Sequence, residues 1–204
     1  MFVYDHLFPM GQPERPAISC FPMLGAIAAM TGRIAIGPLV ARVGLVPNAV
    51  LVNQFKTLDR MAPGRVIAAV GTGDSKSLSE HEIFGLPFLS RADRLALLED
   101  ACHRLRDAGI TPWSSGGSPA VRAIAAKLGV AHNLWAVDAS VVAAEPDLTI
   151  TWAGPPPVDV GAHLESLAEA GATWAVYAPP PSTDWPAMVE RLAVGRVLGT
   201  AEGA

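Results

Sequence analysis

The sequence predicts an α/β protein in which a parallel β-sheet is covered by helices. Short apolar runs of the strand type alternate with helical stretches along the 204 residues. The runs are apolar on both faces, as strands buried between two layers are. Their regular separation by helices favours parallel pairing, so the sheet is either an open doubly wound sheet or a (β/α)₈ barrel.

Seven segments have the composition of strands, and no internal repeat or composition change divides the series. The chain is also long enough to bury one sizeable core. We therefore expect a single barrel-type domain over residues 1–204. The predicted strands are 2–4, 33–40, 65–70, 111–115, 133–137, 148–152 and 173–178.

Six helices are predicted between and after these strands. Three of them have clear start and stop signals, because a Ser or Asp stands where an N-cap belongs and a Gly closes the end. The clearest is 91–108, with Ser90 before it, Gly109 after it and apolar residues three or four positions apart. The predicted helices are 20–31, 47–61, 91–108, 118–129, 159–170 and 185–193.

Composition excludes several classes of function. A formal net charge of −4 without a Lys/Arg cluster argues against nucleic acid as a partner. No apolar run is long enough to span a membrane. Two cysteines, Cys20 and Cys102, are too few for a disulfide framework and are expected to be buried thiols of a cytoplasmic protein.

Ligands of either architecture bind at the carboxyl ends of the strands, so the residues that follow each strand are the candidates. Asp5 and His6 follow the first strand, although an acid and a His at this place are also typical of a helix cap and a surface residue. The segment "SEHEIFG" offers Glu80, His81 and Glu82. Their spacing matches no zinc signature, and a solvated loop is the expected state.

Two glycine motifs follow later strands. "GTGD" at 71–74 lacks the third glycine of a dinucleotide fingerprint, so it is weak evidence for that reading. "SSGGS" at 114–118 opens a helix that has a Ser cap and a Pro at its first position. It is either a phosphate-binding turn or a tight strand-to-helix connection, and the sequence favours neither.

Taken in order, several stretches resemble the luciferase-like monooxygenase superfamily. These stretches are "FVYDHLFP", "TGRIAIG", "TLDRMAPGR", "VGTGD", "EHEIFGLPF" and "PWSSGGSPAVRAIAAKLG". The resemblance covers nearly the whole chain. It implies a luciferase-like TIM barrel and an oxidoreductase that transfers hydride to or from a small organic substrate, or oxygenates it, with deazaflavin coenzyme F420 or with FMN.

The resemblance also implies roles for residues near the first two strands. Asp5 would bind the flavin or deazaflavin near its ring. His6 would stand at the reactive face as a proton donor or electrostatic partner. Val40, Ala41 and Arg42 would form the bulge that supports the ring, where many members have a cis non-prolyl peptide bond. Arg42 would alternatively meet an acidic cofactor tail or be a solvated charge.

Further roles follow for the two glycine motifs. Asp74 and Ser79 match an acid and an amide of the sugar-phosphate-dependent relatives, and a two-residue insertion lies between them. Ser79 replaces the amide, which puts that contact in doubt. Gly116, Gly117 and Ser118 would hold the cofactor phosphate through backbone N–H groups.

In this superfamily the motif "FVYDH" closes the second barrel strand, so the resemblance implies that the first strand and helix are missing from this chain. We expect a shortened gene model. A seven-stranded barrel that acts as a non-catalytic flavin-binding or partner subunit is the alternative. The oligomeric state stays open, with a homodimer as one arrangement, and no metal is expected.

Overall fold

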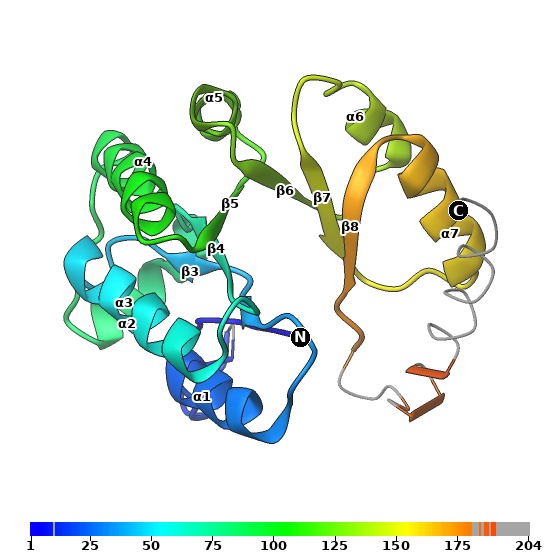
Figure 1. Ribbon diagram of the computed structural model, residues 1–204. Helices are drawn as coiled ribbons and strands as arrows, with labels where there is room; N and C mark the ends of the chain where they lie inside the picture. Colours follow the sequence, from blue (N-terminus) through cyan, green and yellow to red (C-terminus); the bar gives the residue numbers. More distant parts are fainter. Residues whose placement is uncertain (10, 181–183, 185, 188, 191–204) are drawn as a thin grey trace. The chain divides into compact units, whose positions relative to one another are not determined.

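The computed structural model describes residues 1–9, 11–180, 184, 186–187 and 189–190. The chain divides into two compact units, Met1–His132 and Asn133–Ala204. Both are built from parallel strands and helices, which confirms the predicted α/β class (Figure 1). The single domain expected over residues 1–204 stays a prediction.

The strands of the first unit are short and parallel. Strand β1 pairs with β2, and β4 lies between β3 and β5. An isolated bridge joins Ile36 to Val66, so the segment that carries β2 and β3 runs between β1 and β4. The bounds are β1 Phe2–Val3, β2 Gly37–Pro38, β3 Ala41–Arg42, β4 Ile67–Gly71 and β5 Thr111–Ser115.

The prediction of one continuous strand over 33–40 is wrong. Regular pairing begins only at Gly37, and two short strands replace the single one. The break lies at Leu39 and Val40, whose peptide bond is cis. Before the break the chain pairs with β1, and after it the chain pairs with β4. Pro38 adds to the interruption because it has no N–H to donate to a ladder.

Four predicted helices of the first unit are confirmed, with bounds that differ by one residue at most. They are α1 Cys20–Met30, α2 Asn48–Met61, α4 Arg91–Asp107 and α5 Pro119–Leu128. The Ser90 side chain accepts a hydrogen bond from the Asp93 N–H, and Gly129 ends α5 in the left-handed conformation. A 3₁₀ turn, η1 Ser75–Ser77, and a short helix, α3 Leu78–Ile83, were not predicted.

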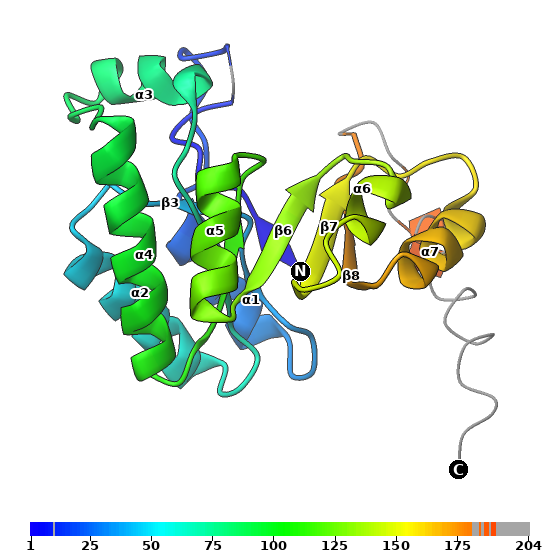
Figure 2. The same cartoon turned by 90° about the horizontal axis from the view of Figure 1, so that it is seen from above.

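The core of the first unit lies between these helices and the strands. Helix α2 packs against α1 and α4, and α4 packs against α5, as can be followed in Figure 2. Helix α4 also packs against β5. Leu24, Phe55, Leu98 and Leu105 are fully buried at these contacts. Both cysteines are free and buried, as predicted, and burial raises the pKa of each thiol to about 12.

The second unit continues the alternation of strands and helices. Strand β6, Ala131–Trp135, crosses the division between the units, and β7, Ile150–Gly154, lies between β6 and β8, Ala172–Tyr177. A short helix α6, Ala139–Ala143, and α7, Val160–Glu169, complete this unit. Its buried core is formed by Leu134, Val142, Ile150, Trp152 and Leu167.

The predicted strands of this unit are confirmed with shifts of one or two residues. The predicted helix 159–170 is α7, whose start is capped by the Asp159 carboxylate. The predicted helix 185–193 falls largely outside the described residues. Within the described part of the chain, no helix is both long enough and apolar enough to cross a membrane.

Candidate functional site

The register of the first unit brings the predicted site residues to one edge. Arg42 is paired with Gly71, and Gly71 is paired with Ser115, so the ends of β3, β4 and β5 lie in a row. The segments that follow them, 43–44, 72–74 and 116–118, therefore leave the sheet together. Asp5 follows β1 and joins the same edge, because its Oδ2 accepts a 2.6 Å hydrogen bond from the Arg42 backbone N–H.

A buried ionic network occupies this edge. The Arg42 side chain is only 5% exposed and lies between two carboxylates. Its Nε donates to Asp5 Oδ1 at 2.9 Å, and its Nη2 donates to Glu80 Oε2 at 2.7 Å and to the Asp5 backbone oxygen at 3.1 Å. The expectation that Arg42 is a solvated charge is wrong. Both Asp5 carboxylate oxygens accept a hydrogen bond from Arg42.

The environment of Glu80 differs from the solvated loop that the sequence predicts. Its side chain is 1% exposed on α3, so the prediction of a solvated loop around Glu80 and His81 is wrong. Three donors surround its carboxylate: the His6 ring, the Leu7 backbone N–H and the Arg42 guanidinium. Glu80 and His81 form the buried face of α3, and Ser77 at the end of η1 is buried as well.

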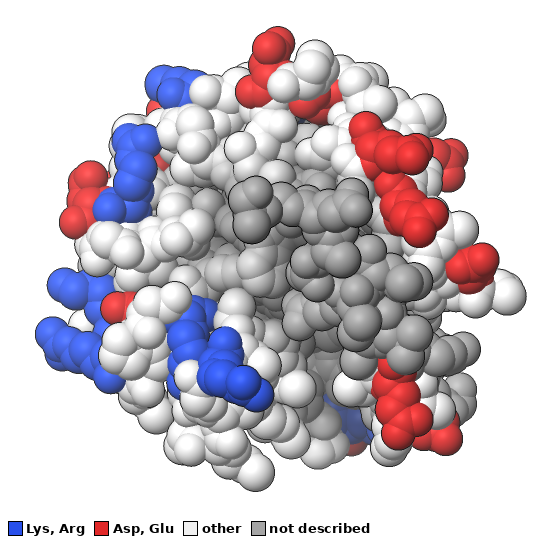
Figure 3. All heavy atoms as spheres, turned by 45° about the vertical axis from the view of Figure 1, so that its right-hand side comes forward, with Lys and Arg blue, Asp and Glu red and all other residues white. Residues whose placement is uncertain are grey.

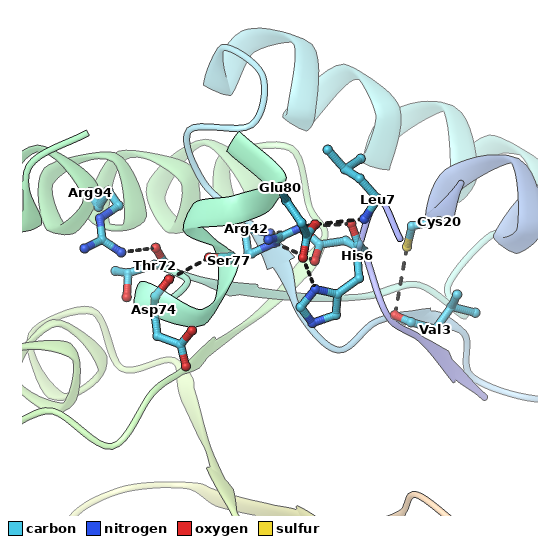
Figure 4. Close-up of polar contacts among 11 residues, drawn as sticks. Val3, His6, Leu7, Cys20, Arg42, Thr72, Asp74, Ser77, Glu80 and Arg94 are labelled. Atoms are coloured by element: carbon cyan, nitrogen blue, oxygen red, sulfur yellow. Dashed lines mark hydrogen bonds and ion pairs between the residues drawn. The ribbon is translucent and has the colours of Figure 1, made fainter. Parts of the chain in front are cut away.

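His6 is the member of this network that reaches the surface. Its side chain is 29% exposed, compared with 1% for Glu80, and its Nδ1 lies 2.5 Å from Glu80 Oε1. Figure 4 shows the ring held from Nδ1, with its far side turned away from Glu80. One nitrogen of the imidazole is therefore anchored by the protein, and the other is directed away from the anchor.

The two carboxylates of the network have opposite pKa shifts. Burial raises the pKa of Asp5, and the charge of Arg42 and its hydrogen bonds oppose this shift only in part. Burial also favours the neutral form of Glu80. There, the hydrogen bonds from Arg42, Leu7 and His6 outweigh burial and hold the pKa below its usual value. Glu80 is consequently a carboxylate at neutral pH.

Asp74 and Ser79 lie close to the network in sequence and are exposed. The Asp74 carboxylate accepts a hydrogen bond from the Lys76 N–H at 2.9 Å, and the Ser77 hydroxyl donates to the Asp74 backbone oxygen. In Figure 4 the Asp74 carboxylate and the His6 ring extend to the same side of the chain. Ser79 lies on α3 next to Glu80 and is exposed.

Gly116, Gly117 and Ser118 form the turn between β5 and α5. Gly116 has a φ of 145°, which favours glycine, and Gly117 is exposed, with no atom within 4 Å of an added Cβ. The Ser118 hydroxyl accepts from the Val121 N–H at 3.4 Å and caps α5. An uncrowded turn at a capped helix start suits an anionic group.

Arg94 is a site residue that the sequence analysis missed. Its Nη1 donates to the backbone oxygens of Thr72 at 2.8 Å and Gly73 at 3.0 Å, and its guanidinium lies over the Phe88 ring. It therefore ties the segment after β4 to α4. A basic residue one turn into a helix has no sequence signature for such a contact, since its partners are backbone oxygens.

Metal binding has no support in the described residues. They contain no group of three or more His, Cys, Asp or Glu side chains that could hold a metal ion. The site therefore consists of a buried ion network, one partly exposed imidazole and one glycine turn.

Comparison with models of protein families identifies the family of this chain. The model for luciferase-like monooxygenases matches residues 1–175. The chain belongs to the luciferase-like monooxygenase family. The resemblance found in the sequence is thereby confirmed.

Individual relatives agree with this assignment. An F420-dependent glucose-6-phosphate dehydrogenase of Nakamurella multipartita is 33% identical over 112 residues, which are 52% of this chain and 31% of the relative. The chain thus spans about a third of the length of that relative.

Solved structures show the same fold. The coenzyme F420-dependent tetrahydromethanopterin reductase of Methanopyrus kandleri matches with a TM-score of 0.71 at 13% identity, covering 96% of this chain and 88% of that one. A riboflavin lyase with modified FMN matches with a TM-score of 0.58 at 12% identity, covering 83% and 55%. The predicted luciferase-like barrel class is confirmed, with a parallel sheet consistent with a partial barrel.

Proposed function

We propose that the chain carries the cofactor-binding edge of an F420-dependent oxidoreductase that acts on a small organic substrate. The observation that carries this proposal is the partly exposed His6 ring, anchored through Nδ1 to the buried Glu80 carboxylate. An imidazole held in this way can exchange a proton with a bound molecule through its other nitrogen. The F420-dependent dehydrogenases to which the chain is similar favour F420 over FMN.

The residues present suit a flavin or deazaflavin. The turn at Gly116 and Gly117 leaves room for a phosphate group at the start of α5, with Ser118 as the cap. Val40 is the second residue of the cis peptide bond, and together with Ala41 it gives the edge an apolar stretch before Arg42. When bound, the cofactor would supply hydride chemistry, which no amino-acid side chain provides.

Each predicted residue then has a distinct task. His6 would hold or take up a proton, and Asp74 would offer a second, exposed carboxylate on the same side. Asp5 would act by fixing Arg42, whose backbone belongs to the edge. Ser79 is exposed on α3 and would contact the substrate or the cofactor.

Two alternatives remain beside this proposal. FMN is the second cofactor to test, because a riboflavin lyase with modified FMN shares the fold. A non-catalytic flavin-binding or partner subunit is the second function to test. A homodimer and the absence of nucleic-acid partners remain part of the proposal.

Fluorescence titration of the purified chain with F420, and separately with FMN, tests the proposal. We expect F420 to bind in the micromolar range and Gly117→Asp to weaken binding at least tenfold, because its carboxylate would repel the phosphate. Gly32→Asp is the matched control, since an added Cβ there also meets nothing within 4 Å. It should leave binding unchanged.

Three other outcomes would change the conclusion. Tighter binding of FMN than of F420 would make the protein a flavin-binding member of the family. Equal weakening by Gly117→Asp and Gly32→Asp would show that net charge, rather than the glycine turn, controls affinity. Failure of both cofactors to bind would contradict the proposed function.

A further inference from the structure

The Glu80 carboxylate has three hydrogen-bond partners, and two of them can act only as donors. Its Oε2 accepts from the Leu7 backbone N–H at 2.8 Å and from Arg42 Nη2 at 2.7 Å. Neither of these groups can accept a hydrogen bond in exchange. Its Oε1 remains for His6 Nδ1, at 2.5 Å. Helix α3, β3 and the segment after β1 are thereby joined at one carboxylate.

The chemistry of this carboxylate determines which His6 nitrogen carries a proton. An ionised carboxylate only accepts hydrogen bonds, so Nδ1 must be the donor. In the neutral imidazole, Nδ1–H leaves Nε2 with a free lone pair. Nε2 is the nitrogen that faces away from Glu80.

We infer that Glu80 is a positioning residue that keeps His6 Nδ1 protonated, so that Nε2 acts as the proton acceptor of the site. This inference deepens the proposed function and rests on it. Glu80 itself is buried and does not reach a substrate. It acts through His6, as a carboxylate does when it orients a catalytic imidazole.

The arrangement suits the oxidation of an alcohol. His6 Nε2 would accept the hydroxyl proton of the alcohol, and a bound oxidised F420 would supply the hydride acceptor that the oxidation needs. The Glu80 carboxylate would stabilise the imidazolium that results. The other charged neighbours are Asp5 and Arg42, and Arg42 pairs with both Asp5 and Glu80. The Tyr4 ring lies 6.3 Å from the His6 ring.

Nitrogen-15 NMR of the histidine side chains tests the inference without cofactor or turnover. In the wild-type protein titrated to alkaline pH, we expect the His6 nitrogen that gives up its proton to be Nε2. In Glu80→Gln, the amide oxygen must serve Leu7 and Arg42, so the amide NH₂ turns to His6 Nδ1. The unprotonated nitrogen should then be Nδ1. Glu82→Gln, at an exposed position of the same helix, should keep the wild-type pattern.

An Nε2–H tautomer in the wild-type protein would overturn the inference, even if Glu80→Gln did not fold. An unchanged tautomer in a folded Glu80→Gln variant would overturn it as well. Reversal in Glu80→Gln, with no change in Glu82→Gln, supports it.

Measurements of kcat and KM distinguish a failure of this inference from a failure of the proposed function. If the protein turns over an alcohol with F420, Glu80→Gln should lower kcat at least tenfold and change KM little, whereas Glu82→Gln should alter neither. Equal kcat in the wild type and Glu80→Gln would contradict the positioning role. Absence of turnover in the wild type would contradict the proposed function, while the tautomer result would stand.

Discussion

His132 is the residue at which protonation should oppose folding most directly. Its side chain is fully buried, and its Nδ1 lies 3.0 Å from the Ser114 hydroxyl. Burial, together with the nearby charge of Arg122, lowers its pKa to about 4. In the unfolded chain the imidazole has an ordinary pKa near 6.5. Between these values, the unfolded chain binds a proton that the folded chain does not.

The free energy of unfolding should therefore fall as pH decreases from 6.5 to 4, by on the order of 3 kcal/mol. Urea denaturation at pH 7.0, 5.5 and 4.5 measures this loss. His132→Gln removes the titrating group and should flatten the dependence in this window, while His103→Gln should leave it unchanged. Glu80 contributes in a lower window, because its lowered pKa delays its protonation. Equal slopes for the wild type and His132→Gln would contradict the prediction.

Single residues of the site differ in how far the sequence predicts them. Asp5 and His6 follow an apolar strand directly, so their position alone places them at the edge. The burial of Glu80 and Arg42 could not be predicted from the sequence. It depends on the attraction between the two side chains, which are 38 positions apart in the chain. A charged side chain in isolation is expected in water, and only its partners make burial favourable.

At the scale of elements, Gly37 controls how closely β2 approaches β4. An added Cβ at Gly37 would lie 2.0 Å from the backbone oxygen of Ile67. The Gly37 N–H also donates to the Met1 oxygen and the Leu39 N–H to the Val3 oxygen, so β2 is held on its other side by β1. The strand has no room to move away from either neighbour.

We expect Gly37→Ala to destabilise the first unit by about 3 kcal/mol or more, because backbone must shift to admit the methyl group. Thermal and urea denaturation, followed by circular dichroism, measure the change. Gly32→Ala is the matched control, since its added Cβ meets nothing within 4 Å, and it should change stability by less than about 1 kcal/mol. A Gly37→Ala variant as stable as Gly32→Ala would contradict the tight packing of β2 against β4.

The elements also show where sequence patterns have predictive power. Helices such as α4 and α5 were predicted because they extend over several turns and have side-chain or glycine caps. Helices α3 and α6 have six and five residues, too few for an apolar period to repeat. The division of 33–40 into β2 and β3 depends on a switch of pairing partner, which no local pattern records.

On the scale of the whole molecule, alternation of strands and helices was sufficient to predict the α/β class. It did not choose between an open sheet and a barrel, because both have the same local pattern. The motifs shared with the luciferase-like family predicted the barrel, and the family match over residues 1–175 confirms this prediction. Motifs were needed because closure of a sheet depends on contacts between strands, which composition does not encode.

Charge is distributed unevenly along the chain. Residues 1–132 contain 13 Lys and Arg and 10 Asp and Glu, whereas residues 133–204 contain nine Asp and Glu and two Arg. Figure 3 shows several acidic side chains exposed on the surface. In α7 the acidic residues extend to the C-terminal end, where the helix dipole disfavours them. The second unit should consequently be destabilised by repulsion between its own charges.

Salt should therefore stabilise the second unit more than the first. Raising NaCl from 0.02 to 0.5 M shortens the screening length from about 20 Å to about 4 Å, which removes most repulsion between surface carboxylates. Amide hydrogen exchange should show protection of β7, β8 and α7 rising by about 1 kcal/mol, with a smaller change in β4 and α4. Glu165→Lys, at an exposed position of α7, lowers the negative charge and should reduce the salt effect in that unit. An equal response of both units, or an unaltered response in Glu165→Lys, would show that charge repulsion does not limit the stability of the second unit.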